Sequence, residues 1–479
     1  MTEEWEMTIT GKDLIAAGYK PGAWFKDVLE QTASLDRESG LAFAKKFSDR
    51  LDQERLERIA RQLPLQDPIT FRINVRPENQ AEEDNLEAVL KGFRELTRTP
   101  TVIAGAVMPD TCPTGTNGEI PVGGVIAAKG AIHPGMHSAD ICCSMFVTKV
   151  HGVDPVDLLD AGQSVTHFGP GGRIDGRFSP PDVLLERFNA NRFLSHPKIM
   201  SAARSHFATQ GDGNHFFYVG TDHQGESCIV THHGSRGVGA LLYKMGRMVA
   251  EDYRVELSPE TPAHNAWIPL DSEDGEEYWA ALQLVREWTR LSHQAIHDGS
   301  LAVLGASVRD RLWNEHNFCF REDDVIWHAK GATPVHAPFL PDSDGRQIIP
   351  LNMAQPILIV EGERNSLNMG FAPHGAGRNT SRSAHLRSIG DEPHSEVMKR
   401  ETAGIDARFF SPDIDITELP SAYKNAESVV RDIEHFGLCR VVERIQPYGC
   451  IMGGDFEANA PWKRKKMEKI DVSETSPSL

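Results

Sequence analysis

The chain has 479 residues, of which 40% are hydrophobic and 25% charged, a composition typical of a globular protein with a large core. Its formal net charge of −18 argues against a protein that coats nucleic acid nonspecifically, although it is compatible with a local basic groove or with bound divalent cations. The seven cysteines form no disulfide framework, so we expect reduced thiols, with one or more available to bind metal.

The sequence contains no run of about 18 uncharged apolar residues that would predict a membrane span. Its first residues, MTEEWEMTITGKDL, are acidic and polar and lack the basic start and apolar stretch of a signal peptide. We therefore expect a cytoplasmic protein without membrane association.

Residues 1–67 are rich in charge, and apolar residues recur at helical spacing in segments such as Leu41 to Arg61. From about Pro68, short β-rich runs punctuated by Gly and Pro predict strands. These runs are ITFRINV, TVIAGAVM, GGVIAAKGAI and CSMFVTKV.

Helical patterns return around residues 181–208, 239–255 and 275–300. Residues 324–390 are again strand and loop with many glycines, and near the end Ala422 to Phe436 predicts a helix and CRVVERIQP a strand. We found no repeats and no regular βαβ rhythm. The sequence therefore predicts an α+β fold with one large domain of mixed sheets flanked by helices. The predicted division is an N-terminal helical extension over 1–67, a main domain over 68–458, and a polar, basic C-terminal tail over 459–479.

Histidines and cysteines stand in Gly-rich loops at several places. In HPGMHSADICC (133–143), Asp140 and Cys143 follow a Pro-Gly turn at the start of a predicted strand, where both can reach one ion. The alternative is that Cys143 is a small buried hydrophobe. In GDGNHFF (211–217), His215 is a candidate ligand, and the alternative is a plain turn before a strand.

In THHGSRGVG (231–239), either His232 or His233 can bind metal, and the loop with Arg236 can hold phosphate. The alternative is a turn with surface histidines. Between residues 316 and 333, His316 precedes WHAKGAT, in which Lys330 beside a Gly-Ala turn can contact phosphate or can be a solvated lysine.

The string HGAGRNTSR (374–382) is the most specific of the set. Two arginines, Arg378 and Arg382, with a Gly-rich backbone suit a polyphosphate, and they share one face if a helix starts here. His374 can be a ligand, a base or a nucleophile. Together the strings imply a metal site beside a phosphate site, and their thiolate and imidazole groups suggest zinc or another borderline-soft ion.

In this order the strings resemble the signature of the RtcB-type RNA-splicing ligases, from about Pro109 to about Gly453. The strings that carry the resemblance are MPD (108–110), PVGGV (121–125), DICC (140–143), GDGNHF (211–216), HHGSRG (232–237), HN (316–317), KGAT (330–333), IIP with VEG (348–362), HGAGR with SR (374–382) and AYK (422–424).

The resemblance implies a GTP- and manganese-dependent ligase that joins 2′,3′-cyclic phosphate or 3′-phosphate RNA ends to 5′-hydroxyl ends through a guanylyl-histidine, in tRNA splicing or RNA repair. It implies RNA as the partner, such as tRNA halves or cleaved RNA, and often a small activating protein, archease. The implied ligands of two Mn²⁺ ions, with Cys143 bridging them, are Asp140, Cys143, His215, His232 and His316.

By the same resemblance, His374 is the histidine that attacks GTP, and Asp110 matches an acidic position near the site. Asn214, Lys330 and Arg378 match positions that contact the nucleotide or the reacting phosphates. The implied nucleotide-binding residues are Asn214, Asn352, His374, Gly375, Ala376, Gly377, Arg378 and Tyr423.

Several positions depart from the family pattern. The residues that differ are Thr111-Cys112, Tyr218, His233, Leu351 to Ala354, and Met452. The resemblance implies that Tyr218 replaces an acidic residue that contacts guanylate, and that Met452 replaces a lysine that reaches guanine. We therefore expect a divergent paralogue whose nucleotide preference or RNA ends differ from those of the main family.

Two other functions remain open. A metal-dependent phosphodiesterase or phosphatase that heals RNA ends without ligation is suggested by the changes at Tyr218, Asn352 and Met452. A non-catalytic RNA-binding protein would not need the metal and nucleophile set. The string TGKDLIAAGYKPG (10–22) also resembles one in tRNA nucleotidyltransferases; the alternative is a helix that ends at Gly18 before a Lys-Pro-Gly turn.

Overall fold

The computed structural model describes residues 8–115 and 117–456, which form two compact units. The first unit comprises the chain up to Pro64 with Val255–Pro259, and the second comprises Leu65–Arg254 with the chain from Glu260. The division predicted at residues 67 and 68 stays a prediction, and the predicted tail, 459–479, lies outside the described residues. None of the helices in these residues is both long and apolar enough to cross a membrane.

The first unit is helical, as the sequence predicts. Thr10 and Asp13 form a capping box at the start of its first helix: the Thr10 hydroxyl accepts from the Asp13 N–H, and Asp13 Oδ2 accepts from the Thr10 N–H at 2.9 Å. Gly18, at φ +91°, then reverses the chain, so the expected helix end is confirmed. The helices are α1 (Gly11–Ala16), α2 (Trp24–Gln31) and α3 (Arg37–Arg61), around a core of Ile9, Leu14, Val28 and Ala44.

A five-stranded sheet forms one part of the second unit. Its strands lie in the order β1, β2, β3, β11, β10, and neighbours are antiparallel except for the parallel pair of β1 and β2. The strands are β1 (Arg72–Ile73), β2 (Val102–Cys112), β3 (Val122–Lys129), β10 (Asn317–Glu322) and β11 (Val325–Lys330).

A larger, eight-stranded sheet forms the other part. Seven strands follow the order β13, β14, β17, β6, β7, β5, β9, and β16 pairs with β17 in parallel. Its strands are β5 (Ser144–Val150), β6 (Phe216–Thr221), β7 (Ser227–His233), β9 (Val308–Glu315), β13 (Gln347–Ile349), β14 (Ile357–Glu361), β16 (Asp406–Phe409) and β17 (Arg440–Met452). Two short pairs complete the strands: β4 (Ala131–Ile132) with β8 (Ile268–Pro269), and β12 (Ala332–Pro334) with β15 (Phe371–Pro373).

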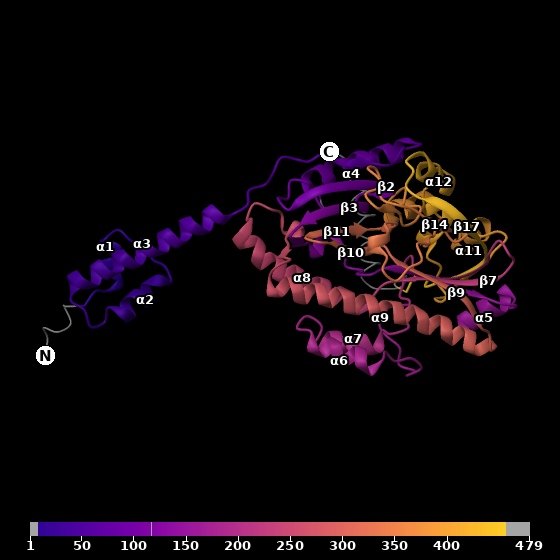
Figure 1. Ribbon diagram of the computed structural model, residues 1–479, viewed down its shortest axis with the longest axis horizontal. Helices are drawn as coiled ribbons and strands as arrows, with labels where there is room; N and C mark the ends of the chain where they lie inside the picture. Colours follow the sequence, from indigo (N-terminus) through magenta and orange to yellow (C-terminus); the bar gives the residue numbers. More distant parts are fainter. Residues whose placement is uncertain (1–7, 116, 457–479) are drawn as a thin grey trace, which may run out of the picture. The chain divides into compact units, whose positions relative to one another are not determined.

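Helices cover the larger sheet, and the predicted α+β class is confirmed (Figure 1). The long helix α9 packs with α5 against strands of this sheet, and α6 lies against α9. The helices of the second unit are α4 (Gln80–Leu96), α5 (Pro155–Val165), α6 (Asp182–Ala190), α7 (Pro197–Ser205), α8 (Arg236–Leu257, which ends in the first unit), α9 (Glu273–Leu304), α10 (Arg382–Ile389), α11 (His394–Glu401) and α12 (Ala426–His435).

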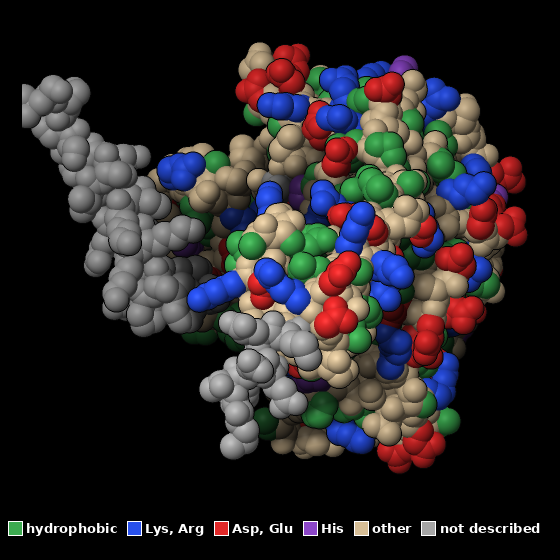
Figure 2. Space-filling model, turned by 90° about the vertical axis from the view of Figure 1, so that its left-hand side faces the viewer, with side chains coloured by type: hydrophobic (Ala, Val, Ile, Leu, Met, Phe, Trp, Pro, Cys, Tyr) green, Lys and Arg blue, Asp and Glu red, His purple; other side chains and the backbone are tan. Residues whose placement is uncertain are grey.

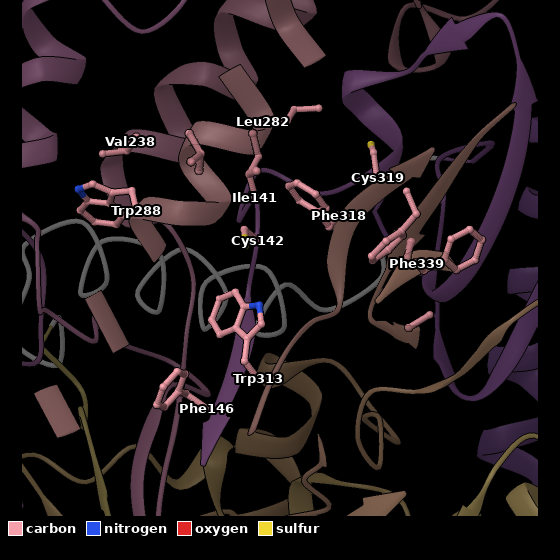
Figure 3. Close-up of a cluster of buried hydrophobic side chains, with 14 of the residues drawn as sticks. Ile141, Cys142, Phe146, Val238, Leu282, Trp288, Trp313, Phe318, Cys319 and Phe339 are labelled. Atoms are coloured by element: carbon pink, nitrogen blue, oxygen red, sulfur yellow. The ribbon is translucent and has the colours of Figure 1, made fainter. Parts of the chain in front are cut away.

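The main hydrophobic core of the second unit includes residues at the start of β5 and in the turn before it. Ile141 and Cys142 lie among large buried side chains that include Phe146 and Trp313 (Figure 3). Burial of each such side chain contributes about 1.5–3 kcal/mol, so this core holds the turn before β5 firmly. Cys142 is therefore a small buried hydrophobic residue. The sequence left that role open for Cys143, its neighbour in the chain.

The surface carries both signs of charge. On the face drawn in Figure 2, Lys and Arg side chains alternate with Asp and Glu side chains and form no large basic patch. On this face, the mixed pattern offers no extended basic surface for a nucleic-acid backbone.

Candidate active site and metal centre

A pocket with about 1150 Å³ of empty space, part of it open to solvent, lies between strands of the two sheets. Val122 of β3 and Lys330 of β11 line it from the smaller sheet, and Phe216 of β6 and His232 of β7 from the larger one. Most of the predicted site residues come together on its wall: Asp140, Cys143, Asn214, His232, His316, Lys330, Asn352, His374, Gly375, Ala376, Gly377, Arg378 and Tyr423.

Five of these predicted residues, with His215 included, form two adjoining groups of metal-ligating atoms. Cys143, His232 and His316 form one group, and Asp140, Cys143 and His215 form the other. Within each group the ligand atoms lie within 4.8 Å of one another, and Cys143 belongs to both. His215 is not on the pocket wall itself, but its Nε2 lies 3.2 Å from Asp140 Oδ2 and 3.5 Å from Cys143 Sγ.

Backbone contacts orient two of the imidazoles. Nδ1 of His215 donates to the Gln210 carbonyl at 2.7 Å, and Nδ1 of His232 donates to the Asn214 carbonyl at 3.0 Å. The proton on Nδ1 leaves a lone pair on each Nε2, which is the nitrogen that faces the other ligands. His232 Nε2 also lies 3.1 Å from His316 Nε2 and from Cys143 Sγ. Lone pairs, a thiol and a carboxylate that converge in this way fit a bound cation.

Strand geometry explains why these side chains meet. Cys143 immediately precedes β5, His215 immediately precedes β6, and His232 lies on β7 opposite Met145 of β5 and Phe216 of β6. Because these strands are neighbours, their residues at one end of the sheet lie side by side.

Alternation along β7 decides between the two adjacent histidines. His232 lines the pocket, whereas His233 points to the opposite face, where its ring stacks on His293 of α9 at 3.4 Å between centroids. Thr231, on the same face as His233, lies 2.7 Å from His293 Nδ1 and 2.8 Å from His297 Nε2 through its hydroxyl. These buried contacts fix the strand that carries His232.

Burial sets the protonation of the ligand groups. It lowers the pKa of His232 and of His316 well below the usual range, so both imidazoles are neutral. It raises the pKa of the Cys143 thiol. For Asp140, burial acts to raise the pKa, but the hydrogen bond and charge of His215 prevail and bring it down to about 2. A bound cation would further favour the thiolate.

His374 follows β15 and is held by Asp110 of β2. Asp110 Oδ2 accepts from the His374 backbone N–H at 2.9 Å and from its Nδ1–H at 2.6 Å, and Asp110 is fully buried. The ring of His374 lies 4.8 Å from that of His316 between centroids. A proton on Nδ1 leaves Nε2 of His374 as the nitrogen with a free lone pair, next to the ligand cluster.

The two arginines of the HGAGRNTSR string do not share a helix, because the chain is a loop from His374 until α10 begins at Arg382. They meet instead at Glu418: its Oε1 lies 2.6 Å from Arg378 Nη2 and from Arg382 Nη2. Tyr423 donates to Glu418 Oε2 at 2.5 Å. One buried carboxylate thus joins two arginines and a tyrosine, of which Arg378 and Tyr423 line the pocket.

Other predicted residues make contacts that fix their position. Lys330 Nζ donates to the Ile120 carbonyl at 3.2 Å, and Asn352 Oδ1 accepts from the Ala354 N–H at 3.0 Å. Arg236 does not line the pocket: its guanidinium donates to Thr209 Oγ1 and to the Gly169 carbonyl. The phosphate role considered for Arg236 therefore has no support in the geometry.

Two residues near the site were not singled out from the sequence. Glu418 belongs to no recognisable string in the sequence. The only signal for it was the pair Arg378 and Arg382, which has no acidic residue nearby in the sequence to balance its charge. Lys424, in the AYK string, is buried, and its Nζ donates to the carbonyls of Pro109 and Thr111, on either side of Asp110. It therefore positions the residue that holds His374.

The sequence model of the family "RtcB: tRNA-splicing ligase RtcB" matches residues 187–453. The tRNA-splicing ligase RtcB of Pyrococcus abyssi is 28% identical over 338 residues, which are 59% of this chain and 34% of that protein. Its namesake from Thermococcus kodakarensis is 26% identical over 340 residues, covering 61% and 66%.

The RNA-splicing ligase RtcB1 of Escherichia coli is 26% identical over 383 residues, which are 73% of this chain and 90% of that protein. The match thus covers 34% of the length of the Pyrococcus abyssi protein and 66% of the length of the Thermococcus kodakarensis protein. The family model nevertheless covers more than half of the chain, and its range includes His215, His232, His316 and His374. The chain therefore belongs to the RtcB family.

Proposed function

We propose that this protein is a metal-dependent RNA ligase that joins 2′,3′-cyclic phosphate or 3′-phosphate RNA ends to 5′-hydroxyl ends, in tRNA splicing or RNA repair. The observation that carries the proposal is the 2.6 Å contact between Asp110 Oδ2 and His374 Nδ1, beside the Cys143, His232 and His316 cluster. Nucleotidyl transfer through a histidine requires an imidazole with one nitrogen free to attack, and this contact leaves Nε2 of His374 free. The names of the relatives support RNA as the substrate.

In the first step, Nε2 of His374 attacks the α-phosphorus of a nucleoside triphosphate. A phosphorus–nitrogen bond forms, and the bond from phosphorus to the pyrophosphate oxygen breaks. Asp110 keeps the proton on Nδ1 and stabilises the positive charge that the ring gains. Arg378 and Lys330, both on the pocket wall, would hold the phosphates in line.

Two Mn²⁺ ions are the proposed metals, and when bound they neutralise phosphate charge and stabilise the charge that develops during transfer. Asp140, Cys143 and His215 would hold one ion, and Cys143, His232 and His316 the other. The donor set alone would equally suit zinc. Manganese therefore rests on the family resemblance.

In the later steps, an oxygen of the RNA 3′-phosphate attacks the nucleotidyl phosphorus, and the bond to His374 breaks. A cyclic phosphate must first be opened by water. The 5′-hydroxyl oxygen of the second RNA end then attacks the activated 3′-phosphate, loses its proton to solvent, and releases the nucleoside monophosphate. The resemblance implies GTP as the nucleotide, archease as an activating partner and the cytoplasm as the location.

The test is covalent labelling of the full chain, loaded with manganese, by α-labelled nucleoside triphosphates. We expect an acid-labile adduct that His374→Ala abolishes and that the control His435→Ala, at an exposed position on α12, retains. Adduct formation followed by sealing of RNA ends supports the proposal. No adduct with any nucleotide, with archease present, together with opening of cyclic phosphates, would instead identify the end-healing phosphodiesterase.

A further inference from the structure

We infer that the pocket selects adenine over guanine, so that the nucleotide passed to His374 is an adenosine nucleotide. This inference rests on the proposed use of a nucleoside triphosphate and concerns the base alone. It follows from the unequal distribution of polar groups around the pocket.

One end of the pocket is charged and the other is apolar. The ligand cluster, His374, Lys330 and Arg378 gather at the charged end, where the triphosphate is the only part of a nucleotide that matches them. The base must then occupy the other end. The pocket residues that form the apolar end belong to one hydrophobic cluster: Tyr218, Met353, Ile357, Cys450 and Met452, with Phe216 packed against them.

Strand pairing joins the two ends. Phe216 on β6 lies opposite His232 on β7 on one side and opposite Met452 on β17 on the other. Tyr218, two residues after Phe216, lies opposite Cys450, two residues before Met452. The two pairs therefore lie on the same face of the sheet. The sheet therefore forms a continuous floor that leads from a metal ligand to the apolar end.

The two polar side chains on this floor, Tyr218 and Cys450, offer a base no carboxylate acceptor. Tyr218 donates its hydroxyl to the Ile445 carbonyl at 3.0 Å, and burial raises the pKa of Cys450, which keeps its thiol neutral. The two carboxylates among the pocket-lining residues that the structure describes are Asp140 and Glu418. Asp140 contacts His215, while Glu418 accepts hydrogen bonds from Arg382 and Tyr423 and forms an ion pair with Arg378.

Guanine and adenine differ in what they require of such a surface. Guanine presents an N1–H and an amino group side by side, with a carbonyl next to them, and specific binding needs an acceptor such as a carboxylate for the two donors. Adenine presents fewer polar groups, so it loses less when it leaves water for an apolar surface. A buried donor without a partner weakens binding by about tenfold or more.

The experiment measures equilibrium binding to the full-length His374→Ala variant, loaded with manganese, so that no adduct forms. The probes are ATP and GTP analogues that cannot be cleaved between the α- and β-phosphates. We expect the ATP analogue to bind at least about tenfold more tightly. Equal affinities, tighter binding of the GTP analogue, or no binding of either would overturn the inference.

A matched pair of variants, each combined with His374→Ala, tests the cause. Met452→Glu supplies an acceptor at the apolar end, and Met452→Leu keeps the end apolar. If the missing acceptor sets the preference, the Met452→Glu variant should bind the GTP analogue about tenfold more tightly than the Met452→Leu variant does. An unchanged ratio in a variant that unfolds at the wild-type temperature would overturn this cause.

The covalent labelling described above separates the two proposals. An adduct that forms only with GTP would refute the base preference and leave nucleotidyl transfer intact. Tighter binding of the ATP analogue without any adduct in the wild type would refute transfer and leave the base preference intact.

Discussion

The carboxylate of Asp110 accepts two hydrogen bonds from a single residue, His374, through the backbone N–H at 2.9 Å and through Nδ1–H at 2.6 Å. The contact joins β2 to the segment after β15, which are far apart in sequence. It fixes both the orientation of the imidazole and the nitrogen that carries the proton.

Asp110→Asn is expected to slow adduct formation by about 10²–10⁴-fold, because a neutral amide stabilises the charged ring less and permits the wrong tautomer. Nucleotide binding should change little. The measurement is a single-turnover labelling rate beside an equilibrium affinity. A rate within a few-fold of the wild type would show that Asp110 does not support the nucleophile.

Gly331 leaves room for the imidazole of His374. Its φ is +65°, and an added Cβ would lie 2.8 Å from His374 Cε1 and 2.9 Å from Nδ1. Gly331→Ala should therefore displace the ring from Asp110 and reduce labelling by at least about tenfold.

Gly130 provides the matched control for this variant. Its φ is +63°, and an added Cβ meets nothing within 4 Å. Gly130→Ala incurs the same backbone strain, about 1 kcal/mol, without the clash. Labelling that falls equally in both variants would mean that backbone strain, and not the displaced ring, is responsible.

Cys143 should be required for metal binding, because it is the residue common to both ligand groups. Cys143→Ser is expected to lose most bound manganese, measured by elemental analysis after dialysis. It should also remove the thiolate-to-metal absorption band when cobalt replaces manganese. If this variant kept both its full manganese content and the cobalt absorption band, a bridging role for Cys143 would be contradicted.

The neighbouring thiol serves as the control. Cys142 is buried in the core with Ile141 and Phe146 (Figure 3), and it belongs to neither of the two ligand groups. Cys142→Ala should keep full metal content while the protein loses about 1 kcal/mol of unfolding free energy. Loss of metal in both variants would indicate a general effect on the turn before β5.

The pattern of strands and helices followed from the sequence where periodicity was strong. The helix around 275–300 is confirmed as α9, and the CSMFVTKV run as β5. The choice between His232 and His233 did not follow from local residues. Alternation shows that they face opposite ways, but which face meets the pocket depends on α9, which packs His293 against His233.

The arginine pair shows a second limit of local patterns. Residues 374–382 offered a helix start, but the chain begins α10 only at Arg382, with the Ser381 side chain accepting from the Ala384 N–H as its cap. Glu418, which gathers Arg378 and Arg382, lies some forty residues away in a short turn. The spacing of residues in the sequence does not predict an ion pair between side chains so far apart in the chain.

Glu418 should hold the arginines in place for phosphate binding. Glu418→Gln removes the negative charge that Arg378 and Arg382 share and puts an NH2 donor in place of one accepting oxygen. We therefore expect about 1–3 kcal/mol less unfolding free energy and about tenfold weaker triphosphate affinity. Glu427→Gln, on α12, is the surface control. An unchanged affinity for inorganic triphosphate would show that Glu418 supports stability alone.

His133 should make the protein sensitive to acid. It is fully buried, its Nε2 lies 2.8 Å from Thr101 Oγ1, and its Nδ1 lies 2.9 Å from the Asn265 carbonyl. Burial lowers the pKa of His133 to about 4 from a usual value of 6.5. Between these values the unfolded chain takes up a proton that the folded chain does not, so stability present above pH 6.5 is lost as the pH falls towards 4.

His133→Gln removes this group, so the slope of unfolding free energy against pH should decrease in that window by up to about 1.4 kcal/mol per pH unit. The measurement is urea unfolding at several pH values through that window, followed by tryptophan fluorescence. The variant should be less stable than the wild type at neutral pH, where the buried contacts of His133 are lost, and the difference should narrow in acid. Parallel curves for the two proteins would mean that His133 titrates alike in the folded and unfolded chain, and that its burial does not contribute to the acid response.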